Sequence, residues 1–149
     1  MMVNALLAVA SGATFGPYGA GCAGTLGVPG WAAVAGSRPV IGTTLNTNVS
    51  NVPFGIALVG LGFSNTQSGA LPLPFDLTVI GMTGCSLLAD PLVLDVAAGV
   101  APNAAWSFAI PNSAAVLGIV LFGQGFSVDP SANPFGITAS NGARIKIGL

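Results

Sequence analysis

The stretch FGITASNGARIKIG, residues 135–148, decides the fold class of this chain. Its two halves, FGITAS and ARIKIG, are rich in the β-branched and apolar residues that are typical of strands. In the second half, Arg144 and Lys146 alternate with apolar residues, so one face is expected to meet water and the other the core. Charges on a terminal strand also commonly protect a sheet edge. The Asn-Gly pair at 141–142 predicts a tight hairpin turn between the halves.

Short runs of the same β type recur along the chain between Gly, Pro, Asn and Ser residues. The run FGIALVGLGFS (54–64) is apolar on both faces, which predicts a central strand that is covered on each side. One helical turn is expected in IPNSAAVLG (110–118), with Asn112 as its cap. The other runs predicted as strands are VIGTTLNTNV (40–49), LTVIG (77–81), SLLAD (86–90), LVLDVA (92–97), AAWSFAI (104–110) and GIVLFGQGFSVD (118–129). This spacing predicts an all-β fold, a two-sheet antiparallel β-sandwich of the jelly-roll or immunoglobulin-like kind.

Charged residues are scarce in this 149-residue chain, which has 3 Lys and Arg, 4 Asp, no His and a net charge of −1. No basic patch is available to hold nucleic acid. The commonest general base is missing and the Asp residues are scattered, so we expect no enzyme, no metal site and no cofactor. Asp95 is expected to cap a turn or to pair with Arg38. A membrane-spanning helix needs about 20 mostly apolar residues in a row, and the most apolar stretches here are shorter and broken by Gly.

The chain begins with the apolar stretch MMVNALLAVA (1–10), followed by the Gly-rich stretch SGATFGPYGAG (11–21). Three interpretations compete: a signal-peptide remnant without a basic start, the first strand of the chain's own sandwich, and a strand donated to a neighbouring subunit. The third also accounts for the low charge, because a surface with few charges has little electrostatic protection against self-association. We therefore expect residues 1–15 to be a donor-strand arm and tether, and residues 16–149 to be the β-sandwich domain.

The donated strand is expected to bury apolar side chains in the neighbour, namely Val3, Ala5, Leu6, Leu7 and Val9. Each larger side chain contributes about 1.5–3 kcal/mol before the entropy of association is counted. The arm and its groove lie on different surfaces, so the contact is head-to-tail and propagates as a filament unless a ring closes. The expected partner is therefore the chain itself, as a homopolymer.

Five further residues are candidates for covalent or binding chemistry. Cys22 and Cys85 fit no zinc or haem motif, and they are either two buried thiols or a disulfide, which is favoured in a secreted protein. Asn48, in the sequence NVS, is a candidate glycosylation site, so glycans are a second expected partner. Trp31 and Trp106 can form a sugar platform, although such residues are more often anchors of a core or interface.

Several stretches together resemble a secreted bacterial β-sandwich domain of planctomycete-type and myxobacterial-type genomes. They are YGAGCAGTLGVPG (18–30), ALVGLGFS (57–64), LPFDLTVIGMTGCSLLADP (73–91) and AIPNSAAVLGIVLFGQGFSVDPSANPFGITASNGARIKIG (109–148). The resemblance implies an extracellular location and a Cys22–Cys85 disulfide, and it brings no catalytic residues. Some relatives of this kind are protomers of extracellular fibrils built by strand exchange.

These observations predict a structural subunit of an extracellular bacterial filament that assembles head to tail by donating its N-terminal strand. The alternative is a secreted monomeric β-sandwich module for adhesion or display, with carbohydrate as a candidate ligand.

Overall fold

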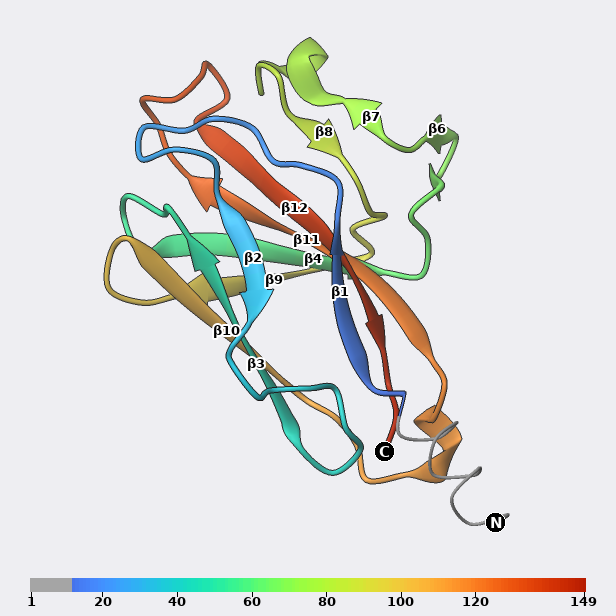
Figure 1. Cartoon of the computed structure of the whole chain (residues 1–149). Coiled ribbons are helices and arrows are strands. Elements are labelled where there is room, and N and C mark those ends of the chain that lie inside the picture. The colour runs from blue at the N-terminus through green and yellow to red at the C-terminus, as the bar shows by residue number, and fades with distance from the viewer. Residues whose placement is uncertain (1–11) are drawn as a thin grey trace.

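The computed structural model of the chain describes residues 12–149. Its main feature is one eight-stranded antiparallel sheet with the strand order β1-β12-β11-β4-β9-β10-β3-β2 (Figure 1). The strands are β1 (Thr14–Tyr18), β2 (Gly30–Ala33), β3 (Thr44–Ser50), β4 (Ile56–Gly62), β9 (Val93–Ala98), β10 (Asn103–Ala109), β11 (Val120–Val128) and β12 (Ile137–Lys146). The prediction of an all-β antiparallel fold is confirmed.

The sheet curls until its two ends approach each other, so its shape is close to a barrel (Figure 1). Beyond one end of β1, the side chain of Asn141 in β12 binds the backbone of Trp31 in β2. Beyond the other end, the N–H of Ile41 donates to the carbonyl of Gly148 at 3.0 Å. The eight strands form one continuous sheet, and the two separate sheets of a sandwich are therefore not confirmed.

β12 is one uninterrupted strand of 10 residues, so the hairpin turn predicted at Asn141 and Gly142 is wrong. Gly142 pairs with Gln124 of β11 on one side and with Tyr18 of β1 on the other. A Cβ atom at position 142 would lie 2.6 Å from the ring of Tyr18. This glycine therefore makes room for an aromatic ring across the strand instead of making a turn.

The predicted alternation along the end of β12 is confirmed. Arg144 is exposed, whereas the side chains of Ile145 and Ile147 are 1% and 4% exposed. The strand is not a sheet edge, because β1 and β11 pair with it on its two sides. The charges of β12 therefore mark its outer face and not an unpaired edge.

β4 lies in the middle of the strand order, as its apolar pattern predicts. On its inner face, Ala57 and Val59 belong to the core inside the curl. On its outer face, Leu58 packs against a second apolar cluster. Both faces are covered over most of the strand, which explains why apolar residues occupy successive positions.

Residues 63–92, which we call the excursion, leave the main sheet between β4 and β9 and cover part of its outer face (Figure 1). The excursion contains β5 (Gln67–Ser68), β6 (Leu71–Pro72), β7 (Phe75–Asp76), the 3-10 helix η1 (Leu77–Ile80) and β8 (Ser86–Leu87). A strand was predicted over 77–81, but the carboxylate of Asp76 accepts a hydrogen bond from the N–H of Thr78 at 2.9 Å and caps η1. This local bond competes with extended backbone.

A second 3-10 helix, η2 (Ala114–Val116), lies within the helical turn predicted at 110–118. Its cap is Ser113, whose hydroxyl accepts a hydrogen bond from the N–H of Ala115 at 3.2 Å. The predicted cap, Asn112, is therefore wrong by one residue.

Two apolar clusters hold these elements together, one inside the curl and one beneath the excursion. The inner cluster contains Trp31, Leu45, Val49, Val52, Ala57, Val59, Ala97, Ala104, Trp106, Ile110, Ala143, Ile145 and Ile147. The outer cluster contains Cys22, Leu77, Met82, Cys85, Phe126 and Ala139. Most of the apolar stabilisation therefore comes from the inner face of the main sheet.

β1 lies inside the segment that was expected to be a tether, and it begins at Thr14, before the predicted domain boundary at residue 16. Its Phe15 ring packs edge-on against Trp31, with ring centroids 5.0 Å apart. The predicted donor residues lie outside the described residues; they are Val3, Ala5, Leu6, Leu7 and Val9.

Candidate interaction surfaces

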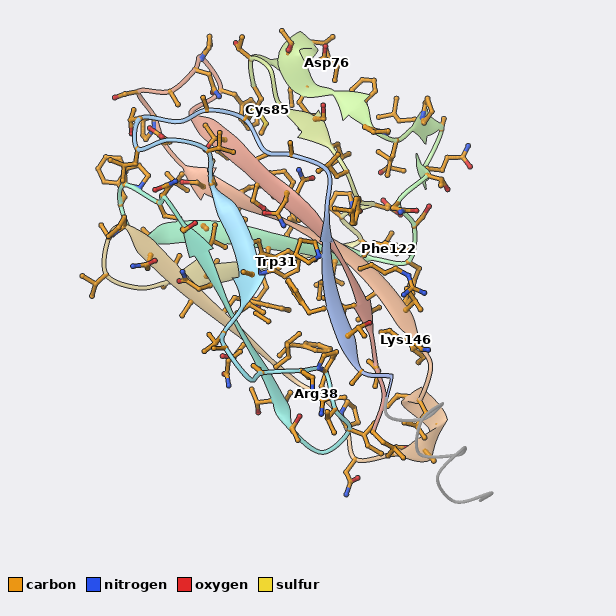
Figure 2. The ribbon with its side chains drawn as sticks, in the orientation of Figure 1. Trp31, Arg38, Asp76, Cys85, Phe122 and Lys146 are labelled. Carbon is orange, nitrogen blue, oxygen red and sulfur yellow. A yellow bond between two sulfur atoms is a disulfide. The ribbon has the colours of Figure 1, made fainter. Side chains whose placement is uncertain are left out.

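A disulfide joins Cys22 to Cys85, with their Cα atoms 4.9 Å apart, so the predicted bond is confirmed. It ties the segment that follows β1 to the excursion, which Figure 2 shows at the end of the molecule opposite Lys146. The N–H of Cys22 also donates to the carbonyl of Ala139 in β12 at 3.0 Å. The excursion is therefore anchored to β12 through the disulfide and the hydrogen bond of Cys22.

A buried glutamine makes the second anchor of the excursion. The amide nitrogen of Gln124 in β11 donates to the carbonyls of Ser86 and Ser140, both at 2.9 Å, and its oxygen accepts from the N–H of Leu88 at 3.0 Å. The Tyr18 hydroxyl donates to the carbonyl of Leu88 at 2.6 Å, and burial raises the pKa of this phenol to about 12. These bonds satisfy backbone groups of Ser86 in β8 and of Leu88 next to it, and they fix β8 on the outer face of the sheet.

We call the place where β12 meets β2 the closed seam. The Asn141 side chain reaches across it, where its oxygen accepts from the N–H of Trp31 at 2.9 Å and its nitrogen donates to the carbonyl of Trp31 at 3.0 Å. The amide thus offers the same donor and acceptor as a neighbouring strand. Trp31 is 1% exposed and lies in the middle of the molecule (Figure 2).

We call the place where β9 leaves β10 the open seam. These strands are consecutive in the chain, yet their register holds the single pair Ala98 and Ala105 next to the connecting turn. Beyond that pair β9 follows β4 as far as Val93. β10 instead follows β3 as far as Ala109, and the two strands diverge (Figure 1).

One carboxylate bridges the open seam. Asp95 of β9 accepts a hydrogen bond from the indole nitrogen of Trp106 in β10 at 2.9 Å. Its other oxygen accepts from the backbone N–H of Val96, also at 2.9 Å. The expected pairing of Asp95 with Arg38 is therefore wrong, because the carboxylate supports the seam instead.

An apolar hollow of about 200 Å³ lies at the wide end of the open seam. It is lined by Leu61, Gly62, Phe63, Leu92, Val93, Phe108 and Leu121. Three of its side chains are largely exposed, Phe63 at 68% and Leu92 and Val93 at 61% each. The hollow leads into the inner core, because Leu61, Phe108 and Leu121 pack against that core.

A second apolar surface, which we call the outer patch, lies on the other face of β9 and on the excursion. It has a hollow of about 290 Å³ lined by Leu58, Leu77, Ile80, Met82, Leu87, Pro91, Leu94, Phe126, Phe135 and Ile137. Leu94 is 56% exposed, and Val96, which follows it on the same face of β9, is 60% exposed. Large apolar side chains are thus exposed on both faces of one strand.

The remaining candidate residues lie apart from these seams or inside the core. Trp31 and Trp106 are 1% and 5% exposed, so they form no sugar platform on the surface. Asn48 lies on β3, where its amide donates to the side chain of Asn103 at 2.9 Å. Asp129 is buried and accepts hydrogen bonds from the backbone and hydroxyl of Thr25. The Asp129 carboxylate therefore ties the segment of Thr25 to the end of β11.

Two absences concern the described residues alone. Between residues 12 and 149, no three His, Cys, Asp or Glu side chains gather as metal ligands would. Over the same range, no helix has the length and apolar character needed to cross a membrane.

Reasoning from sequence missed the bridging roles of Asn141 and Asp95 and did not separate the two seams. One signal of the exposed surface was present in LVLDVA (92–97), which is apolar on both faces like the central strand β4. In β4 both apolar faces are largely covered, whereas in β9 large apolar side chains on both faces are exposed among the described residues. Comparison of the chain with protein-family models, curated proteins and solved structures finds no match.

Proposed function

We propose that the protein is the structural subunit of an extracellular bacterial filament. Subunits assemble head to tail when the apolar stretch at residues 1–10 of one copy is donated as a strand to the next copy. The observation that carries the proposal is the exposure of large apolar side chains on both faces of β9, namely Val93, Leu94 and Val96 at 61%, 56% and 60%. A strand inside a sheet normally buries at least one of its faces.

The scarcity of charge supports self-association. The chain has 3 Lys and Arg and 4 Asp in 149 residues, and 5% charged residues compare with about 25% in ordinary soluble domains. Contiguous apolar surface without charges around it is typical of an interaction site or of an aggregation hazard. A protomer whose neighbours cover that surface avoids the hazard.

The disulfide supports the extracellular location, because such bonds persist in oxidising compartments. It closes a sequence separation of 63 residues and contributes about 4 kcal/mol in the chain-entropy model. A subunit with a small core and few charges gains most from such a covalent restraint when it stands outside the cell.

Electron microscopy of the purified full-length protein tests the proposal. We expect long fibres of constant width from the intact chain. A variant lacking residues 1–11 should give monomers or irregular aggregates, because β1 starts at Thr14 and the described fold stays intact. The matched control replaces Asn4 with Asp, which keeps the length and the apolar residues of the arm. Dispersed monomers of the intact chain at high concentration contradict the proposal and favour the monomeric adhesion or display module.

A further inference from the structure

We propose that the open seam is the acceptor site for the donated strand, and that its occupant is residues 1–10 of a second copy of this chain. This inference rests on the proposed function and names the site that the proposed function leaves undefined. The argument uses the unpaired edges of β9 and β10, the apolar hollow between them and the pattern of the arm.

The open seam offers strand edges for pairing. β9 pairs with β4 on one side, and on the other side it meets β10 at the single pair Ala98 and Ala105. The N–H of Val96 donates to the side chain of Asp95 at 2.9 Å, so a local carboxylate accepts from it. An extended peptide can therefore add its backbone to a sheet edge here, which is how strand addition gains affinity.

The hollow defines the side chains that such a strand must carry. It measures about 200 Å³ and its lining is apolar, from Leu61 and Phe63 on one side to Phe108 on the other. An apolar cavity of roughly 150 Å³ is already large enough for a benzene molecule. The hollow therefore has room for a leucine side chain, and it disfavours a charged one.

The arm has a matching pattern. Successive side chains of a strand point to opposite faces, so in a donated strand residues 3, 5, 7 and 9 would share a face and Asn4 would lie on the other. The four residues that share a face are Val3, Ala5, Leu7 and Val9, and all are apolar, whereas Asn4 is polar. We infer that Leu7 and its neighbours on the odd face enter the hollow, and that Asn4 points away from it.

The length of the arm suits the seam. The unpaired part of β9, residues 93–97, spans about 17 Å at 3.3 Å per residue, and ten extended residues span about 33 Å. Roughly half of the arm thus remains to connect the seam with β1 of the donating copy.

The outer patch favours a second copy over the chain's own arm. A strand added in the seam covers Val93 and Phe63, but Leu94 and Val96 lie on the other face of β9 and stay exposed. The body of a neighbouring subunit that delivers the arm can also cover this patch. If the arm entered the seam of its own chain, the outer patch would stay exposed. An exposed apolar patch on a protein with few charges favours aggregation.

Cysteine cross-linking distinguishes the occupants. Both native cysteines are joined in a disulfide, so a pair of introduced cysteines reports one contact. Full-length protein carrying Leu7→Cys and Val93→Cys is assembled, oxidised and run on a denaturing gel without reductant. We expect a ladder of covalent dimers and higher multimers. The matched control joins Leu7→Cys to Ala32→Cys, which is exposed beside the closed seam and should give little ladder.

Each outcome decides one question. If the pair Leu7→Cys and Ala32→Cys gives the ladder and the pair with Val93→Cys does not, the assignment of the acceptor site is overturned while the proposed filament function still stands. A cross-linked monomer that migrates faster means that the arm fills its own seam, and it overturns the second copy as occupant. Absence of fibres from the uncrosslinked parent protein overturns the proposed function itself.

A charge at the seam gives an independent readout. We expect Val93→Lys to raise the protein concentration required for fibre growth by at least about tenfold, because a donated strand that covers the hollow would strip water from the ammonium group in an apolar lining. Val100→Lys is the control, since Val100 is 86% exposed in the turn between β9 and β10, and its effect should stay within about twofold. Equal behaviour of the two folded variants contradicts the assignment.

Discussion

The closed and open seams differ in the chemistry of a single bridging side chain. At the closed seam the Asn141 amide both donates to and accepts from Trp31, so it replaces a strand partner. At the open seam Asp95 accepts from Trp106 and from the adjacent backbone. An ionised carboxylate has no proton to donate, so it can satisfy donors on both strands but cannot bind a carbonyl. The comparison teaches that an amide side chain can join two strand edges, because it binds both a backbone N–H and a carbonyl. A carboxylate leaves the backbone carbonyls at its seam available as hydrogen-bond acceptors for another chain.

A row of aromatic rings connects the two seams through the inner core. Phe15 packs on Trp31, Trp31 packs edge-on to Trp106 at 6.2 Å, and Trp106 stacks on Phe108 at 5.8 Å. The hydroxyl of Thr47 accepts from the indole of Trp31 and donates to the carbonyl of Trp106. The seams therefore share one packed interior, and the stability effects of substitutions at each can be compared directly.

The largest effect is expected away from both seams and tests whether they are independent of the excursion. Replacing Cys22 and Cys85 with Ser should lower the free energy of unfolding by about 4 kcal/mol, because the unfolded chain loses its cross-link. Chemical denaturation measures the change, and reductant should then have no further effect on the variant. The open seam takes only Phe63 and Leu92 from the excursion, at its two ends beside β4 and β9, so the cross-linking pattern at Val93 should persist. Its loss would show that the excursion shapes the open seam.

Asn141→Ala should cost about 3 kcal/mol, because the N–H and carbonyl of Trp31 lose their partners in a buried site. Asn141→Asp should lie between this variant and the parent, since a carboxylate can still accept from the N–H but cannot donate. Denaturation curves measure both, with Asn112→Ala as the exposed control. An unchanged Asn141→Asp protein would refute the comparison between amide and carboxylate.

Asp95→Ala should cost about 1 kcal/mol, less than the change at the closed seam, because the open seam lets water reach the indole of Trp106. Asp95→Asn keeps an oxygen that accepts from the indole, so its stability should match the parent within about 0.5 kcal/mol. The same denaturation assay compares the two. A loss at Asp95 as large as that at Asn141 would mean that the seams are equally closed.

The smallest effect concerns β1, which lies beside the closed seam. Burial raises the pKa of Tyr18 to about 12, above its ordinary value of 10.0, so the folded state keeps a proton that the unfolded state releases first. Stability is therefore full below pH 10 and falls as the pH rises toward 12, by less than about 1 kcal/mol because the ring is partly exposed. Tyr18→Phe should lack this fall when denaturation at pH 9 is compared with pH 11. An identical pH response of both proteins would exclude Tyr18 as its source.

Several elements were predictable because their signals are local. The alternation around Arg144 placed the end of β12, and the doubly apolar run at 54–64 placed β4 at the centre. The hairpin prediction failed because a local signal met distant partners. The Asn-Gly pair at 141–142 continues a strand because its neighbours are Trp31 and Tyr18, which lie far away in the chain.

The candidate site was predictable only in part. The apolar arm and the cysteine pair are visible in the sequence, and the pairing of Cys22 with Cys85 is confirmed. The open seam was not predictable, because residues 92–97 have the composition of a buried strand. Their exposure arises because β9 diverges from β10. β9 pairs with β4 and β10 pairs with β3, and these pairings direct the two strands apart.

The sequence by itself determined the all-β class, the alternating faces of the strands and the low charge, because each depends on residue type and on spacings of one or two positions. The tertiary structure alone decided that the strands form one curled sheet, that Asn141 closes one seam and that the other stays open. These features depend on pairs such as Trp31 and Asn141, which are 110 positions apart. Hydrophobic alternation states which face is buried, but it does not state which strand lies beside it.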